Sequence, residues 1–236
     1  MEKKQFLNPD LDVSIVDLTV NDLLLEIHPD IPSLPTNVIF YGKSSAGKSN
    51  VILNLLKFYK KQFKNKTIVF TKTNNGSLMT LKTSHNAIIY NEINDEFGQN
   101  RIKKILDFQK ALKDDGKTPK HIIIILDDFI TDASLSKKGS IFEHLFAFGR
   151  HSNVTTFLTS QSFKQVPAVL RRLSWNDIIY SMSNTVEKNL MCFELCNSIS
   201  KTEREFEAIY KECVEEPYSF MYLDKRKGKW SKRFGK

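Results

Sequence analysis

The chain has 236 residues, of which 41% are hydrophobic and 26% are charged, with a net charge of +8; this composition is typical of a soluble α/β domain large enough to bury a core. No apolar run approaches the ~20 residues that a membrane-spanning helix needs, and the N-terminus lacks the apolar segment of a signal peptide, so we expect no membrane partner and a cytosol-like compartment. The three cysteines, Cys192, Cys196 and Cys213, form neither an even set nor a Cys-x-x-Cys pair, which predicts buried thiols rather than a disulfide framework.

The N-terminal 36 residues mix acidic and apolar side chains and end in Pro29, Pro32 and Pro35, which resist both helix and strand. We expect them to form an arm that leads into the core. From residue 37 onward, apolar β-prone runs alternate with helical patterns. Strands are expected at 37–41, 67–71, 87–90, 121–126, 154–159, 176–181 and 218–223, and helices at 48–62, 99–113, 140–149, 166–173, 185–198 and 202–213. This alternation predicts an α/β fold with a mostly parallel sheet flanked by helices and with ligands at the carboxyl ends of the strands.

Between the first predicted strand and the first predicted helix lies the phosphate-binding pattern G-x-x-x-x-G-K-[ST]. Its glycines let backbone N–H groups turn inward toward a phosphate, and the helix adds the positive end of its dipole. Lys48 supplies charge to the β- and γ-phosphates, and the Ser49 hydroxyl can ligate Mg²⁺. The Lys43 side chain occupies a variable position and is expected to be solvated. The pattern predicts a nucleoside-triphosphate site formed by Gly42, Lys43, Ser44, Ser45, Ala46, Gly47, Lys48 and Ser49.

The run 121–126, which is apolar apart from His121, ends in two carboxylates, Asp127 and Asp128. Such a run is typical of a central parallel strand that is buried on both faces. In P-loop proteins the acid that ends this strand holds Mg²⁺, so Asp127 is the candidate metal ligand. Asp128 would orient or deprotonate the attacking water, which favours hydrolysis of ATP over binding alone. A pair of aspartates at a strand end can also serve only as a turn or a helix cap.

The next predicted strand, 154–159, leads to Gln161. Right-handed crossovers bring each strand up in the same sense, so Gln161 should emerge on the nucleotide side, where an amide can sense the γ-phosphate or position water. The alternative is an ordinary surface glutamine. Arg150 and His151 precede this strand and should lie about 20 Å from the phosphates of the same subunit, too far to take part in the chemistry there.

Two arginines, Arg171 and Arg172, follow on the predicted helix after Pro167. That helix should lie near the carboxyl edge of the sheet and could face a neighbouring subunit. One of the two is therefore a candidate arginine finger, supplied to an adjacent nucleotide to stabilise transition-state charge. The alternative is an exposed pair of helical arginines.

The charge gathers at the C-terminus, where residues 224–236 hold seven Lys or Arg residues against one Asp and so account for six of the eight net positive charges. A basic segment of this kind predicts contact with a polyanion or a solvated, disordered tail. Trp230 and Phe234 within it also allow docking onto a protein. We therefore divide the chain into an arm (1–36), a P-loop core (37–181), an extension of the core (182–223) and a basic tail (224–236).

The order of these motifs resembles the FtsK/HerA superfamily of DNA-pumping ATPases and, within it, the genome-packaging ATPases of large eukaryotic DNA viruses, virophages and their poxvirus-type relatives. The likeness covers about residues 37–181 and rests on the P-loop, Asp127-Asp128, Phe148-Gly149-Arg150-His151, Thr159-Ser160-Gln161 and Pro167 with the two arginines. It implies a RecA-like P-loop NTPase core of the ASCE type, Mg²⁺-dependent ATP hydrolysis and a homo-oligomeric ring, a pentamer or hexamer, that drives double-stranded DNA into a preformed capsid. It also implies a virus factory of the host cell, or the virion, as the location.

On this sequence the resemblance implies that Lys48 and Ser49 bind nucleotide, Asp127 and Asp128 handle metal and water, Gln161 senses the nucleotide, and Arg171 or Arg172 is the finger. Many superfamily members have Glu where Asp128 stands. Because Asp is shorter by one methylene, its water must sit closer, or another acid such as Glu143 serves as the base.

We further expect DNA to be gripped through its phosphates, because a pump must ignore base sequence. Candidate contacts lie on the loop after Asp128, with Lys137 and Lys138, and on a second loop flanked by Lys72 and Lys82. The basic tail would dock to a capsid vertex protein. Two alternatives stay open: a non-packaging FtsK/HerA-type DNA translocase or helicase, and an ATP-binding capsid-assembly protein that uses nucleotide only as a switch. A terminase with its own nuclease is disfavoured, because the region after residue 181 has too few spaced carboxylates for a nuclease domain.

Overall fold

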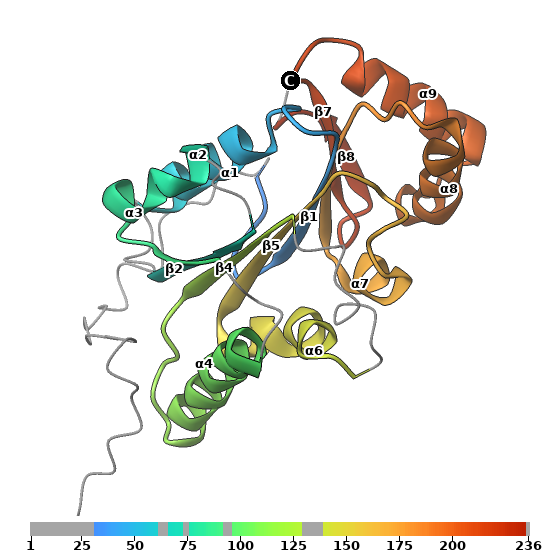
Figure 1. The fold of residues 1–236 in the computed structure, drawn as a ribbon. Helices are drawn as coiled ribbons and strands as arrows, with labels where there is room; N and C mark the ends of the chain where they lie inside the picture. Colours follow the sequence, from blue (N-terminus) through green and yellow to red (C-terminus); the bar gives the residue numbers. More distant parts are fainter. Residues whose placement is uncertain (1–30, 61–65, 73–75, 92–95, 129–138, 235–236) are drawn as a thin grey trace, which may run out of the picture.

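The computed structural model describes residues 31–60, 66–72, 76–91, 96–128 and 139–234. In this part of the chain one sheet holds the strands in the order β3-β2-β4-β5-β1-β6-β7-β8 (Figure 1). The strands are β1 (Asn37–Tyr41), β2 (Lys66–Thr71), β3 (Ile88–Tyr90), β4 (Ile122–Asp127), β5 (Val154–Ser160), β6 (Asn176–Tyr180), β7 (Phe220–Asp224) and β8 (Lys229–Lys232). Strands β1 to β6 pair in parallel, and β7 and β8 extend the sheet in antiparallel fashion.

Helices cover both faces of the sheet (Figure 1). Helices α1 (Lys48–Lys60), α2 (Gly76–Met79) and α3 (Leu81–Ser84) pack on one face. Helices α4 (Glu96–Asp114), α6 (Ile141–Phe148), α7 (Ala168–Leu173), α8 (Thr185–Leu195) and α9 (Glu203–Val214) share the core of the other face. Short 3₁₀ turns follow α6 at Gly149–Ser152 and α8 at Cys196–Ile199.

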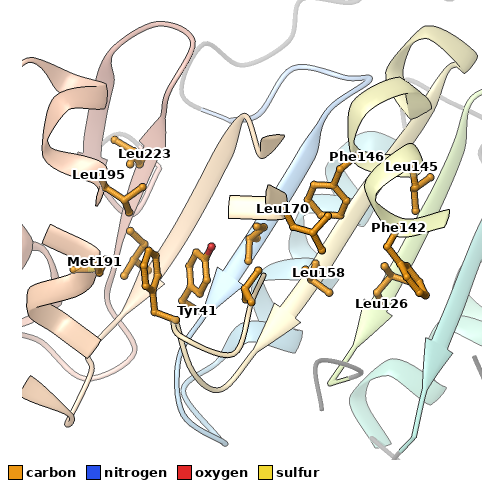
Figure 2. Close-up of a cluster of buried hydrophobic side chains, with 14 of the residues drawn as sticks. Tyr41, Leu126, Phe142, Leu145, Phe146, Leu158, Leu170, Met191, Leu195 and Leu223 are labelled. Carbon is orange, nitrogen blue, oxygen red and sulfur yellow. The ribbon is translucent and has the colours of Figure 1, made fainter. Parts of the chain in front are cut away.

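The two cores follow from the period of two along each strand. On β4, Ile122, Ile124 and Leu126 face the core that α4 and α6 cover, whereas Ile123 and Ile125 face the core under α1. Every residue of β4 is buried, as expected for a central parallel strand. Figure 2 shows the first core, in which aromatic and aliphatic side chains of α6, α7 and α8 pack on the strands.

The predicted seven strands and six helices are all present, with ends shifted by a few residues. The sequence analysis missed α2, α3 and β8, which have four residues each and are too short for a clear periodic pattern. Of the predicted arm, residues 1–30 lie outside the described residues; near its end, the Tyr59 hydroxyl donates to Pro32 O at 2.6 Å. The cysteine prediction is confirmed, because all three thiols are buried and free. No described helix is long and apolar enough to cross a membrane.

The basic segment differs from the predicted tail. Its residues 229–232 form β8, which pairs antiparallel with β7 at the edge of the sheet. The ring of Phe234 packs on Phe220 and Tyr222, with centroids 5.2 Å apart in each pair. Lys232 and Arg233 form ion pairs with Glu216 at 2.8 and 3.1 Å. Apolar packing and these ion pairs hold the segment against the core, so residues 224–234 complete the fold of the preceding extension instead of leaving it as a tail.

Candidate nucleotide-binding site

A cavity of about 630 Å³ opens at the carboxyl edge of the sheet. Residues 44–50 of the P-loop and the start of α1 line one side, and Asp127, Asp128, Thr159 and Gln161 line the other. Ser77 and Tyr218 also line it. The structure therefore brings the predicted P-loop, strand-end carboxylates and glutamine together around one space, because β1, β4 and β5 are neighbours that all end at this edge.

The P-loop glycines are required by geometry. A Cβ on Gly42 would lie 2.8 Å from Cβ of Tyr180, closer than carbon atoms can pack, and Gly47 has a φ of +103°. The loop is anchored at its start by the Gly42 N–H, which donates to Ser160 O at 3.0 Å, and it runs directly into α1 at Lys48. The first turn of a helix therefore points its N–H groups into the cavity.

Lys48 is held within this loop. Its Nζ donates to Gly42 O at 2.5 Å and to Lys43 O at 3.0 Å. Burial lowers the pKa of Lys48, and Asp128 and Asp127 oppose that shift. The ammonium is thus desolvated and lies near both strand-end carboxylates, which suits a group that meets phosphate charge. The neighbouring Lys43 side chain is exposed, as expected.

Asp127 is buried at the end of β4, between hydroxyls from both neighbouring strands. Thr71 Oγ1 of β2 donates to one carboxylate oxygen at 3.2 Å, and Thr159 Oγ1 of β5 donates to the other at 2.8 Å. The strand register explains this, because both threonines are paired directly with Asp127. The two hydroxyls fix the orientation of the carboxylate, as hydrogen-bond partners of metal ligands commonly do.

Thr159 also holds Asp128. Its hydroxyl accepts from the Asp128 N–H at 3.0 Å, so one side chain ties the two aspartates together. Asp128 has a φ of +59°, a left-handed conformation that aspartate tolerates better than most residues. The chain therefore turns sharply at the end of β4 and leaves the Asp128 carboxylate on the cavity wall.

Gln161 is exposed and lies beside Asp128. Its Nε2 donates to Asp128 Oδ2 at 2.7 Å. The glutamine therefore emerges on the nucleotide side of the sheet and contacts the second carboxylate directly. Glu143, the alternative acid, has another place: Glu143 Oε2 accepts from Gly139 N at 2.9 Å at the start of α6. Glu143 is not among the described residues that line the cavity.

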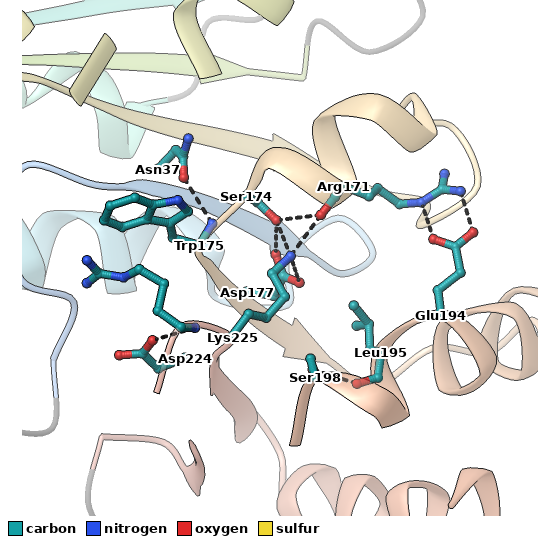
Figure 3. A network of polar contacts seen from close by, with 11 residues as sticks. Asn37, Arg171, Ser174, Trp175, Asp177, Glu194, Leu195, Ser198, Asp224 and Lys225 are labelled. Carbon is teal, nitrogen blue, oxygen red and sulfur yellow. Dashed lines mark hydrogen bonds and ion pairs between the residues drawn. The ribbon is translucent and has the colours of Figure 1, made fainter. Parts of the chain in front are cut away.

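Of the two candidate arginine fingers, Arg171 is disfavoured, because its guanidinium is buried and paired within its own subunit. Its side chain is 8% exposed, and Nε and Nη2 donate to the two carboxylate oxygens of Glu194 at 2.8 and 2.6 Å (Figure 3). Nη1 donates to Phe163 O and Val166 O. Every guanidinium nitrogen is thus engaged within its own subunit. Arg172 is exposed on α7 and stays the candidate.

The same corner of the fold uses a lysine of the basic segment. Lys225 forms an ion pair at 2.9 Å with Asp177, which is completely buried (Figure 3). Its Nζ also donates to Arg171 O at 2.8 Å and to the Ser174 hydroxyl. Burial raises the pKa of Asp177, and Lys225 opposes that shift. The positive charge of Lys225, which was predicted to contact a polyanion, is therefore paired with a carboxylate inside the protein.

Arg150 precedes β5 and so lies at the opposite edge of the sheet, as expected. Its guanidinium stacks on the Trp175 ring at 2.9 Å from the centroid, and Arg226 also stacks on this ring, at 3.7 Å. Burial and the charge of Arg226 lower the pKa of Arg150 to about 10.

Among the predicted DNA-contact lysines, Lys72 and Lys82 are exposed, whereas Lys137 and Lys138 lie outside the described residues.

Residues 30–209 match the sequence profile of the poxvirus A32 protein family. The chain belongs to this family. Among curated proteins it is 24% identical over 159 residues to the DNA packaging protein OPG160 of vaccinia virus (strain Copenhagen), a match that covers 67% of this chain and 57% of the vaccinia protein. The monkeypox virus OPG160 protein is 26% identical over 166 residues, with 67% of this chain and 52% of that protein covered. The chain thus spans little more than half the length of these relatives.

Solved structures show the same fold. The genome packaging NTPase B204 from Sulfolobus turreted icosahedral virus 2, in complex with AMP, superposes with a TM-score of 0.61 at 14% identity, covering 83% of this chain and 95% of that one. The pCW3 conjugation coupling protein TcpA superposes with a TM-score of 0.56 at 14% identity, and the match covers 79% of this chain and 56% of the TcpA chain. The predicted α/β fold, a mostly parallel sheet flanked by helices, is confirmed, and the match to the poxvirus A32 family confirms the predicted resemblance to poxvirus-type proteins.

Sequence reasoning missed four residues that line the cavity: Asn50, Ser77, Thr159 and Tyr218. Thr159 carried a detectable signal, because it stands two residues before Gln161 at the end of a predicted parallel strand. Tyr218 carried none, because it follows α9 in a segment that belongs to the site only through the antiparallel β7.

Proposed function

We propose that the chain is a Mg²⁺-dependent ATPase that moves double-stranded DNA and packages a viral genome into a preformed capsid. The observation that carries the proposal is the link Asp127–Thr159–Asp128 opposite Lys48 and the P-loop in one cavity. The family relatives named DNA packaging protein and the fold shared with a genome packaging NTPase support it. A site for nucleotide binding alone needs no second carboxylate facing the phosphates.

The residues present fit Mg²⁺. Ser49 and Asp127 offer hard oxygen donors, and among the described residues no cluster of three or more His, Cys, Asp or Glu side chains could hold a metal ion alone. Mg²⁺ in nucleotide sites is typically held by one or two protein oxygens together with phosphates and water. When bound, it would neutralise phosphate charge. Lys48 and the backbone N–H groups of the P-loop would position the phosphates, and Asp128 would accept the proton of the attacking water.

Gln161 would couple the nucleotide to movement. Its Nε2 donates to Asp128 Oδ2 at 2.7 Å, so a movement of the amide toward a phosphate would change that contact. The presence or loss of a γ-phosphate would therefore shift Gln161, Asp128 and the segment that follows Asp128. Exposed lysines such as Lys72 and Lys82 would grip DNA through its phosphates. In a homo-oligomeric ring, a pentamer or hexamer, Arg172 would reach the nucleotide of the adjacent subunit. The basic segment, residues 224–234, would bind a capsid vertex protein. The site of action would be the virus factory or the virion.

Replacing Thr159 with valine should lower the kcat of ATP hydrolysis about 10- to 100-fold, because the carboxylate that holds the metal and the N–H of the catalytic aspartate lose their shared partner. Valine keeps the shape of the side chain and removes only the hydroxyl. Thr159→Ser, which restores the hydroxyl, should keep most of the activity. Steady-state hydrolysis measured across a Mg²⁺ titration checks this, and equal kcat values for the valine variant and the unaltered protein would contradict it.

Double-stranded DNA should stimulate the ATPase, and the stimulation should fall steeply as salt rises, because phosphate contacts release counterions. The measurement is the hydrolysis rate at fixed ATP with and without DNA of mixed sequence, from about 50 to 200 mM salt. DNAs of different sequence should stimulate equally. A hydrolysis rate indifferent to DNA at every salt concentration would remove the DNA part of the proposal and leave an ATP-driven switch.

A further inference from the structure

Tyr218 is an aromatic side chain at the mouth of the cavity. It lies between α9 and β7, the residue is 73% exposed, and it lines the same space as the P-loop. Because β7 runs antiparallel to β6, the start of β7 lies at the carboxyl edge of the sheet. A Cβ placed on Gly47 would lie 3.7 Å from the Tyr218 ring. The ring therefore stands directly beside the second glycine of the phosphate loop.

The backbone at Tyr218 is held in a costly conformation. Its φ of +60° lies in the left-handed region, which bulky residues rarely adopt. The surrounding turn fixes it: the N–H and the hydroxyl of the buried Ser219 both donate to Glu216 O, at 3.1 and 2.6 Å. Glu216 also forms ion pairs with Lys232 and Arg233, which lie in and just after β8; we call β7, β8 and the turn between them the edge hairpin. The fold thus keeps an exposed ring in a strained position, which core packing does not require.

We propose that Tyr218 is the platform on which the base of the bound nucleotide stacks, and that the site prefers purine nucleotides. The inference rests on the proposed nucleotide site and deepens it. Residues 44–50 and the polar side chains from β4 and β5 are suited to the phosphates and the metal, whereas Tyr218 is the only aromatic residue among the described residues that line the cavity. A flat ring of this kind binds bases through their π-faces, and the larger purine ring system stacks over more area.

The edge hairpin would then help to position the ring of Tyr218. The ion pairs of Glu216 with Lys232 and Arg233 brace the turn that presents Tyr218. The basic C-terminal segment would therefore support nucleotide binding from outside the cavity, through the placement of one ring. Tyr218 would contact the base itself, and the hairpin residues would act only through it.

The test is equilibrium binding by calorimetry, with Mg²⁺, of ATP, CTP and inorganic tripolyphosphate to the unaltered protein, Tyr218→Gly and Tyr218→Phe. Glycine suits a φ of +60° and removes the whole side chain, whereas phenylalanine keeps the ring and removes only the hydroxyl. Tyr218→Gly should bind ATP about tenfold more weakly, as expected for loss of one stacked base, and bind tripolyphosphate unchanged. Tyr218→Phe should retain the ATP affinity, and the unaltered protein should bind ATP more tightly than CTP.

Two outcomes would overturn the platform alone: unchanged ATP affinity in Tyr218→Gly, or equal losses for ATP and tripolyphosphate. Tyr218→Phe decides between ring and backbone if the glycine variant proves unstable, because a tenfold loss in the phenylalanine variant would also contradict stacking. Failure of the unaltered protein to bind ATP and tripolyphosphate would overturn the nucleotide site and the platform with it. The failure of this inference is thus distinguishable from that of the proposed function.

Discussion

Replacing Lys48 with alanine should reduce ATP hydrolysis by about 10³-fold or more and weaken ATP binding. The ammonium is half-buried, lies in the P-loop and lines the cavity, whereas Lys43, the other basic side chain of the loop, is exposed and is not among the residues that line the cavity. Loss of one preorganised group that stabilises transition-state charge commonly costs about 10²–10³ in kcat, and loss of ground-state binding adds to this. Nucleotide binding and steady-state hydrolysis, measured on the same preparation, check the prediction.

The matched control is Lys57→Ala. Lys57 lies on the same helix as Lys48 but is exposed, so its loss removes an equal charge without touching the cavity. It should leave hydrolysis within about twofold of the unaltered protein, since exposed charges contribute little. Comparable activity in Lys48→Ala and Lys57→Ala would show that the P-loop does not bind the reacting phosphates.

Replacing Asp128 with asparagine should lower kcat by about 10²–10⁴-fold and leave ATP affinity nearly unchanged, because only the proton-accepting group is lost. The substitution is conservative for the fold. Asparagine tolerates the left-handed φ of +59°, and its carbonyl can still accept from Gln161. Binding of ATP with Mg²⁺, followed by single-turnover hydrolysis, separates the two effects.

Asp107→Asn on the exposed face of α4 removes the same charge from a residue that does not line the cavity and should retain full activity. The Asp128 result also decides between motor and switch. A capsid-assembly switch would need nucleotide binding alone, so its function would survive in Asp128→Asn. Undiminished hydrolysis in this variant would exclude Asp128 as the base and return attention to another acid.

Much of the site was predictable because its signals are local in the sequence. The P-loop is a contiguous motif, and Asp127 ends an apolar run that is typical of a buried strand. Gln161 was placed on the correct edge by the rule that parallel strands are connected by right-handed crossovers. The fold followed from the same alternation of strands and helices.

What sequence alone could not supply depends on register and on distant partners. Thr159 meets Asp127 because β5 pairs with β4 in that register, and no local pattern fixes register. Arg171 looked free because its partner Glu194 lies 23 residues away on α8. The basic segment was predicted to be a tail because β8, the strand that pairs with β7, is short and carries two lysines, so no apolar pattern marks it. In each case the role of the residue depends on a tertiary contact that its position in the sequence does not reveal.

The most direct test of the central claim is displacement of a triplex-forming oligonucleotide from double-stranded DNA by the purified protein. If hydrolysis in this cavity drives movement along DNA, the unaltered protein should displace the oligonucleotide with ATP and Mg²⁺, but not with a non-hydrolysable analogue. Asp128→Asn should bind ATP and fail to displace it. A displacement rate that is the same with and without ATP in the unaltered protein would contradict the account.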